Sequence, residues 1–306
     1  MGLVRIRKFS YIFSIILVAA SIVSLAFYGL KFGIDFTGGS LIEAQFDPTG
    51  GGRPDINIVR QKMEALDFGQ VVIQPAGEVG FSIRTRELST DERQKITAEL
   101  SGLGKIKDVS ANTIGPTIGQ ELRSRSIWAM ALVLIAIILY IAFAFRKVSR
   151  PISSWFYGIF AVVALFHDVF IPLGVFSLLG HFKGVEVDTL FVTAILTVLG
   201  FSVHDTIVVF DRIRENLTLA KPASPAGRKE TFEETVGKSL NQTITRSINT
   251  SLTVLIVLTA LFFLGAEATK YFALALIIGI VAGTYSSIFI ASPLLVTWNN
   301  YREKKI

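Results

Sequence analysis

Six long apolar stretches constrain the fold of this chain more than any other feature of its sequence. Each is long enough to cross about 30 Å of hydrocarbon as a helix that rises about 1.5 Å per residue. Hydrophobic residues make up 51% of the 306-residue chain, more than is usual for a soluble domain. The sequence therefore predicts a polytopic α-helical membrane protein with six transmembrane helices. The predicted spans are Ser10–Leu30, Ser126–Phe145, Ile152–Leu179, Asp188–Phe210, Ser247–Gly265 and Tyr271–Trp298.

Three of these spans have individual features. The third and sixth are longer than a bilayer requires, so we expect tilt or a kink there, with Pro172 and Pro293 as kink points. Ser24-Leu25-Ala26 resembles a signal-peptide cleavage site, so a cleaved signal is the alternative for the first span. Its apolar stretch of about 21 residues exceeds a typical signal core, which favours an uncleaved span.

The placement of basic residues predicts the orientation in the membrane. The net charge is +6, and basic residues cluster in the N-terminal segment 1–9, the loop after the second span, the loop 211–246 and the C-terminal tail 299–306. By the positive-inside rule these segments are cytoplasmic, and Lys31–Arg125 lies outside. The charge therefore needs no nucleic-acid partner to explain it. The basic clusters outside the 211–246 loop are Arg5, Arg7 and Lys8; Arg146, Lys147 and Arg150; and Arg302, Lys304 and Lys305.

The segment Lys31–Arg125 alternates between strand and helix patterns. The order β-α-β-β-α-β predicts a small α+β domain of ferredoxin-like type between the first and second spans. The helix at Ser89 opens with a strong capping sequence. The predicted elements are strands at Ser40–Asp47, Gln70–Gln74, Val79–Thr85 and Ile106–Ile114, and helices at Asp55–Asp67 and Ser89–Leu103.

The predicted cytoplasmic loop 211–246 contains an amphipathic helix. After a loop at Pro222–Pro225, Thr231-x-x-Glu234 forms a capping box, and apolar residues follow at every fourth position from Phe232 to Ile244. We expect this helix to lie along the cytoplasmic face and run into the fifth span. A surface helix without any role in coupling remains the alternative.

Several chemistries are excluded or disfavoured. The chain contains no cysteine, which excludes disulfides, thiol catalysis and cysteine metal sites. No nucleotide-binding glycine motif is present, and no enzyme activity or cofactor is expected. Two His-Asp dipeptides, His167-Asp168 and His204-Asp205, do not suit one metal ion, because successive helix residues point about 100° apart. Neither aspartate has the sequence context of an intramembrane protease.

Ionisable residues inside the predicted spans are the candidate functional residues. An acidic residue at mid-bilayer costs on the order of 2.5–3.5 kcal/mol, so such residues usually face the bundle interior and have a function. Asp205 and Asp168 lie within the fourth and third spans, whereas Asp188 lies at an outer edge and suits a helix start. A polar stripe on the fifth span, Arg246, Asn249, Thr250 and Thr253, follows helical spacing. Arg246 is the first residue of this stripe and lies at the depth predicted for Asp205. We therefore expect an ion pair between Arg246 and Asp205. The alternative is that the Arg246 side chain extends to the lipid headgroups.

The sixth span has a small residue at every fourth position. Such a surface permits close helix contact. This surface could pack against other helices of this chain or form an interface with a second membrane subunit, and the sequence leaves both alternatives open. The residues are Ala275, Gly279, Gly283, Ser287 and Ala291.

Three longer motifs resemble the SecF family of protein-translocase subunits. They are Gly33–Gly39 (GIDFTGG), Gly200–Asn216 with its Asp-Arg-Ile-Arg-Glu-Asn end, and the stretch Gln-Thr-Ile-Thr-Arg-Ser from Gln242. The resemblance covers the whole chain. It implies a subunit of the RND superfamily in the cell inner membrane, with SecD, the SecYEG channel, YajC and an unfolded secretory polypeptide as partners. It also implies use of the proton gradient for protein export.

The resemblance assigns roles by position. Asp205 matches the intramembrane acid of the family, Arg246 its partner on the next span, and Asp168 a further matching acid. His204, Asn249 and Thr250 are accessory candidates. The signature residues are Gly33, Asp35, Gly38, Gly39, Asp211, Arg212 and Arg214. Asp35 is equally explained by a turn beside two glycines. The residues alone would also suit half of a lipid or drug exporter, or a scaffold subunit that transports nothing.

Overall fold

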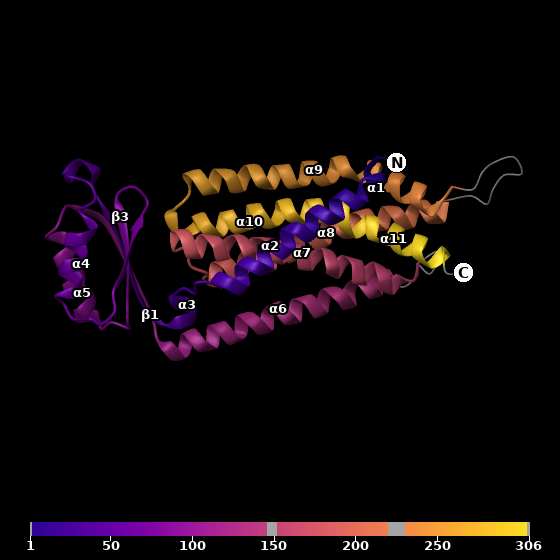
Figure 1. Ribbon diagram of the computed structural model, residues 1–306. Coiled ribbons are helices and arrows are strands. Elements are labelled where there is room, and N and C mark those ends of the chain that lie inside the picture. The colour runs from indigo at the N-terminus through magenta and orange to yellow at the C-terminus, as the bar shows by residue number, and fades with distance from the viewer. Residues whose placement is uncertain (1, 146–151, 220–229, 305–306) are drawn as a thin grey trace, which may run out of the picture. The chain divides into compact units, whose positions relative to one another are not determined.

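The chain forms two compact units (Figure 1). In the computed structural model, residues 2–145, 152–219 and 230–304 are described. One unit, the helical bundle, comprises Met1–Leu30, Ala129–Lys183 and Leu190–Ile306; the other, the α+β domain, comprises Lys31–Trp128 and Gly184–Thr189. The basic residues Arg146, Lys147, Arg150 and Lys305 and the predicted loop at Pro222–Pro225 lie outside the described residues.

Among the described residues, six helical segments are long and apolar enough to cross a membrane, which confirms the predicted fold class. The short helix α1 (Gly2–Arg5) precedes the first of them. The six segments are α2 (Arg7–Tyr28), α6 (Pro116–Ala144), α7 (Ser154–Lys183), α8 (Thr189–Leu219), α9 (Phe232–Leu264) and the series formed by α10 (Glu267–Ser286), a π-helical segment η2 (Ser287–Ala291) and α11 (Ser292–Glu303).

Helices α6, α8 and α9 extend well beyond the apolar stretches that predicted them, and α8 continues to Leu219. Helix α6 begins at Pro116, before the predicted start at Ser126, and α9 is one 33-residue helix that contains both the predicted amphipathic helix and the fifth span. The predicted capping box is present, because the Thr231 hydroxyl accepts from the Glu234 amide and the Glu234 carboxylate accepts from the Thr231 amide. Hydropathy marks where a helix can meet lipid, not where its hydrogen bonding begins.

The two prolines behave differently. Helix α7 runs through Pro172 without an interruption, whereas the sixth segment changes to a π-helical turn at Ser287–Ala291, directly before Ser292 and Pro293. In a regular α-helix the ring of Pro293 would meet the carbonyl four residues earlier. The wider π turn relieves that clash. The kink expected at Pro293 is therefore present as a π-helical turn directly before it.

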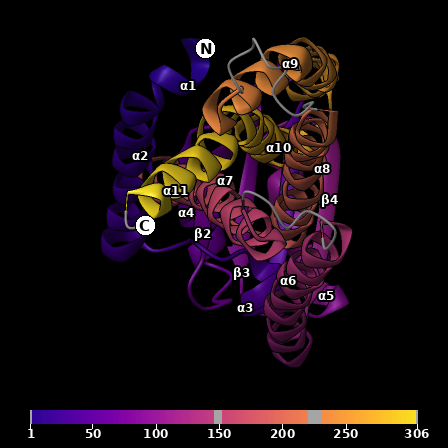
Figure 2. The ribbon, with the colours of Figure 1, turned by 90° about the vertical axis from the view of Figure 1, so that its right-hand side faces the viewer.

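Small residues bring the bundle helices together (Figures 1 and 2). Helix α10 packs between α9 and α7, and α2 packs along α7. The buried face of α2 consists of serines, and Ser24 accepts on its backbone oxygen from the Ser177 hydroxyl at 3.0 Å. A Cβ added at Gly279 would collide with Val198 of α8, and one at Gly283 would lie 2.9 Å from Ser202 Cβ. Gly279 and Gly283 therefore serve packing within this chain.

The α+β domain is a four-stranded antiparallel sheet of order β2-β3-β1-β4. Helices α4 and α5 cover one face (Figure 1). This order and the βαββαβ sequence confirm the predicted ferredoxin-like domain. Ile42, Phe46, Phe81 and Leu100 are fully buried in its core. Its elements are α3 (Ile34–Thr37), β1 (Gly39–Phe46), the 3-10 turn η1 (Pro48–Gly50), α4 (Ile56–Glu64), β2 (Val72–Ala76), β3 (Gly80–Thr85), α5 (Thr90–Ser101) and β4 (Ile106–Ile114).

Candidate functional site

Asp205 lies inside the bundle between α8 and α9. Its side chain is 8% exposed, and its Oδ1 accepts a 2.5 Å hydrogen bond from the Ser247 hydroxyl. Its Oδ2 is buried and has no hydrogen-bond partner among the described residues. An acid in this setting can be neutral after binding a proton or charged after releasing it, and the two states differ strongly in their fit to an apolar interior.

Arg246 makes no ion pair with Asp205 in this conformation of the described residues. Within the described part of the chain no ion pair joins the two side chains, and Arg246 is exposed. In this conformation the neighbouring residue Ser247 faces Asp205 instead, and successive helix residues point about 100° apart. The buried polar stripe of α9 is Thr243, Ser247 and Ser251. The hydroxyl residues at every fourth position of the sequence could have indicated it.

Asp168 of α7 is the centre of a second buried polar cluster. It is fully buried and accepts hydrogen bonds from the hydroxyls of Ser202 on α8 and Ser286 on α10, the latter at 2.8 Å. His167 Nδ1 lies 2.9 Å from Asp168 Oδ1. The two neighbouring side chains thus meet each other. Sequence reasoning missed Ser202 and Ser286.

Hydroxyl pairs join the sixth helical segment to α8 and α9. Thr206, the residue after Asp205, shares a 2.8 Å hydrogen bond with Ser287 at the start of the π-helical segment. The Ser287 hydroxyl also lies 3.5 Å from the backbone oxygen of Ser202. Ser251 of α9 and Thr284 of α10 form another pair at 2.5 Å. The interior of the bundle is therefore polar around both acids.

The predicted polar stripe of α9 points away from the interior. Arg246, Asn249, Thr250 and Thr253 are all exposed, as is His204 on the neighbouring helix α8. The accessory candidates His204, Asn249 and Thr250 thus do not join the buried cluster. Two adjacent helices instead present polar groups on an outer face, where a membrane-spanning helix normally presents apolar ones.

The chain is similar over almost its full length to known protein-export proteins. A family model described as "Protein export membrane protein SecD/SecF, C-terminal" matches residues 95–301, and one described as "SecD/SecF GG Motif" matches residues 23–49. A protein translocase subunit SecF from Thermobaculum terrenum is 44% identical over 97% of this chain and 94% of its own length. The chain belongs to the SecF family.

Further relatives support this membership and the fold. A protein translocase subunit SecF from Synechocystis is 35% identical over 100% of this chain and 96% of its own length. The crystal structure of SecDF, a translocon-associated membrane protein from Thermus thermophilus, has a TM-score of 0.83 at 32% identity and covers 98% of this chain. The chain spans 39% of that solved chain.

The family's glycine motif forms a tight junction in the α+β domain. Gly38 and Gly39 have φ of 74° and 118°, a region that other residues rarely adopt. A Cβ at Gly38 would lie 2.8 Å from Pro116 Cα, and one at Gly39 would lie 2.6 Å from the Thr85 oxygen. Only glycine fits either position. Asp35 accepts from the amide of Thr189 at 2.9 Å, so it is more than a turn residue.

The second signature joins the end of α8 to the start of α9. Arg212 Nε donates to Gln242 Oε1 at 2.7 Å, and Asn216 donates to the same oxygen at 2.9 Å and to the Ser239 hydroxyl at 2.8 Å. Asp211 pairs with Arg214 at 2.6 Å. These contacts hold the two helices side by side at one end, which sets the register that brings Ser247 to Asp205.

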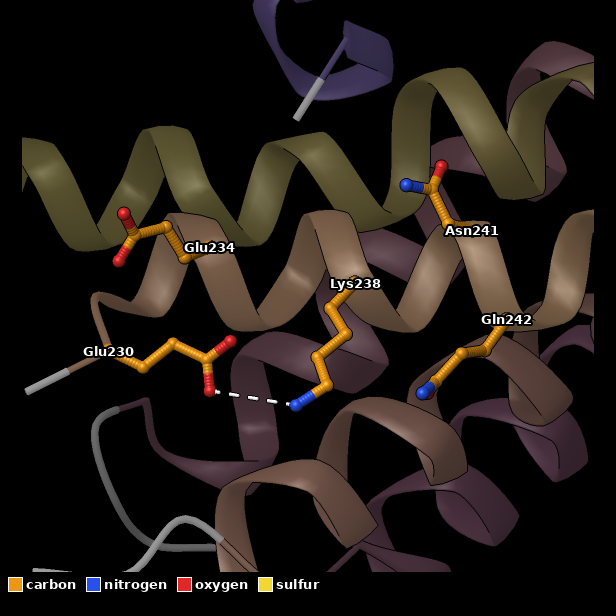
Figure 3. Close-up of a pocket in the computed structure, with 5 residues that line it drawn as sticks. All are labelled: Glu230, Glu234, Lys238, Asn241 and Gln242. Carbon is orange, nitrogen blue, oxygen red and sulfur yellow. Dashed lines mark ion pairs between the residues drawn. The ribbon is translucent and has the colours of Figure 1, made fainter.

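An open hollow lies beside this junction (Figure 3). It has a volume of about 470 Å³, and Glu230 and Lys238 face each other across it at 3.9 Å. Its lining residues are Glu230, Glu234, Lys238, Asn241 and Gln242. Asp205 is not among them. Within the described ranges no group of three His, Asp or Glu side chains is placed to hold a metal ion.

Proposed function

We propose that this protein is a Sec translocase subunit that uses the proton gradient, together with a SecD-like partner, to promote export of unfolded polypeptides through SecYEG. Membership of the SecF family and six membrane-spanning helices support this function. The protein would lie in the cell inner membrane with both termini in the cytoplasm and the α+β domain outside. YajC is a further proposed partner.

Asp205 is the observation on which the proposal chiefly rests. It is buried between α8 and α9 with a single hydroxyl donor and no cation at ion-pair distance among the described residues. A proton that crosses 100 mV releases about 2.3 kcal/mol. That is close to the roughly 2.5–3.5 kcal/mol that a charged residue costs at mid-bilayer. Proton binding at Asp205 can therefore shift an equilibrium between two bundle conformations.

The outer polar face supports a SecD-like partner. Arg246, Asn249 and Thr250 of α9 and His204 of α8 are exposed in this chain. Facing lipid, an arginine there would be costly, so a second membrane subunit is expected to cover this face. We propose that Arg246 is a switchable counter-charge, which pairs with ionised Asp205 and occupies the outer face when Asp205 is protonated. Asp168 would serve as a second intramembrane proton site.

The test is export of a secretory protein from vesicles with an imposed proton gradient. Asp205→Asn keeps the size of the side chain but removes its charge, so the complex should assemble normally and lose gradient-dependent stimulation. Asp205→Glu should retain a fraction, because a carboxylate survives about one methylene away. Asp108→Asn, at an exposed position of β4, is the matched control and should respond as the parent does. A gradient response of Asp205→Asn equal to that of the parent would refute the proposal.

A further inference from the structure

The segment that joins α7 to α8, Gly184–Thr189, is part of the α+β domain. The Gly33 amide donates to the Val187 oxygen at 2.8 Å, and the Val187 amide donates to the Lys31 oxygen at 2.7 Å. Phe32 and Val187 form a parallel β-bridge. The beginning of the domain and the approach to α8 are thus paired through their backbones.

Side chains strengthen this pairing. Arg84, on strand β3, lies 2.8 Å from Glu186 Oε2, and the same nitrogen donates to the Phe32 oxygen at 2.9 Å. Lys31 lies 3.7 Å from the other Glu186 oxygen. A Cβ at Gly184 would collide with the amide of Gln74 on β2. The sheet itself therefore holds the segment that precedes α8.

One further contact reaches α8 directly. Asp35 Oδ2 accepts from the backbone amide of Thr189 at 2.9 Å and from its hydroxyl at 2.5 Å. Thr189 is the first residue of α8. The first amides of a helix lack partners within the helix, and a carboxylate beside them also meets the positive end of the helix dipole. Here the carboxylate comes from a residue 154 positions away in the chain.

We propose that Asp35 is a positioning residue that fastens the α+β domain to α8, so that the domain follows movements of the helix that carries Asp205. This rests on the proposed function of Asp205. Helix α8 is continuous from Thr189 to Leu219, and Asp205 lies 16 positions, about 24 Å, after Thr189. A shift of α8 at Asp205 therefore reaches Thr189 and, through Asp35, the domain.

The first test compares two substitutions in the complete translocase, in vesicles with and without a proton gradient. Asp35→Ala removes both hydrogen bonds and should lower the gradient-dependent increment of export by about fivefold, the scale of losing a helix cap. Export without a gradient should be unchanged. Asp35→Asn retains an oxygen that can accept from the Thr189 amide, so it should keep most of the increment. A residue needed only for folding would lower export under both conditions.

A disulfide supplies the second test. A Cβ added at Gly33, where φ is −72°, would lie 3.7 Å from the Cβ of Asp188, and cystine Cβ atoms lie about 3.5–4.5 Å apart. Gly33→Cys with Asp188→Cys in the Asp35→Ala background should restore the increment when oxidised and lose it when reduced. The same cysteine pair with Asp35 intact should respond in both states, which controls for the loss of Asp188.

Two results would overturn the inference. One is an Asp35→Ala variant with the full increment of the parent. The other is an oxidised disulfide that abolishes the increment in the variant with Asp35 intact, because the attachment would then have to open during transport. Failure of the proposed function gives a different result, since the increment would then survive Asp205→Asn in a protein with Asp35 intact.

Discussion

The Ser247 hydroxyl and the Asp205 carboxylate form a buried pair 2.5 Å apart. A hydrogen bond to a charged group contributes about 1.5–3 kcal/mol, roughly twice the contribution of a neutral one. The hydroxyl therefore favours the charged form of Asp205 more than the neutral form. It can also rotate to accept from the protonated acid, since a serine hydroxyl is both donor and acceptor. Ser247 thus suits either state of the acid.

Ser247→Ala should weaken the gradient response without abolishing it. The substitution removes one oxygen and leaves the small buried residue that the helix contact requires. We expect a several-fold smaller gradient-dependent increment of export, with complex formation unchanged on co-purification. In the Asp205→Glu background, which keeps a fraction of the increment, the same substitution should have little further effect, because the two residues act through one interaction. Additive losses in the double variant would show that Ser247 acts independently of Asp205.

At the same scale, the sequence located the acids but not all of their partners. Asp205 and Asp168 were recognisable from the sequence because a carboxylate inside an apolar span is costly and usually has a function. Ser202, Ser247 and Ser286 were not, since serines are common in membrane helices and their facing direction depends on helix register. Arg246 attracted attention through its charge, although its neighbour Ser247 faces Asp205. The register was fixed by Arg212 and Gln242, whose contact no periodicity reveals.

Among the helices, the seam between α8 and α10 depends on two glycines. A Cβ at Gly279 would overlap Val198, and the neighbouring turn places Gly283 against Ser202. Ser202 in turn donates to Asp168. The close approach of these two helices therefore also builds the polar cluster around Asp168.

Gly279→Ala should destabilise the bundle, although alanine is the better helix former. Forcing a methyl group into a packed contact typically costs about 1–3 kcal/mol. Gly200→Ala is the matched control on α8, because nothing lies within 4 Å of a Cβ there; it should be neutral or gain up to about 1 kcal/mol. Thermal unfolding of the purified chain in detergent measures both. Equal midpoints for the two variants would contradict the packing role of Gly279.

The ends of elements were predictable where local chemistry defines them. Both capping boxes, at Ser89 and Thr231, form as their sequences indicate. The start of α6 could not be predicted in this way. Gln120, Glu121 and Arg123 make its first turns polar, so a search for apolar stretches does not detect them. The π-helical turn before Pro293 depends on how α10 packs, which the sequence does not state.

For the whole molecule, the orientation in the membrane is the proposal on which all others depend. The chain has no cysteine, so single cysteines can be labelled without background. Arg60→Cys, exposed on α4, should react with an impermeant thiol reagent added outside intact cells. Lys238→Cys, exposed on α9, should react only after the membrane is permeabilised. The reverse pattern would refute the proposed topology.

The α+β domain is built from two separate segments of the chain, and this sets an order of events during synthesis. Its first part ends at Trp128 and its second begins at Gly184, so 55 residues lie between them. At roughly 5–20 residues per second, the ribosome needs about 3–11 s to cover that gap. Until then Asp35, Arg84 and the Gly33 amide lack their partners on Gly184–Thr189. The domain can therefore complete its fold only after α7 has crossed the bilayer and α8 has begun to enter it. A chain whose α7 fails to insert would carry an unfinished domain, open to the proteases that remove misassembled membrane proteins.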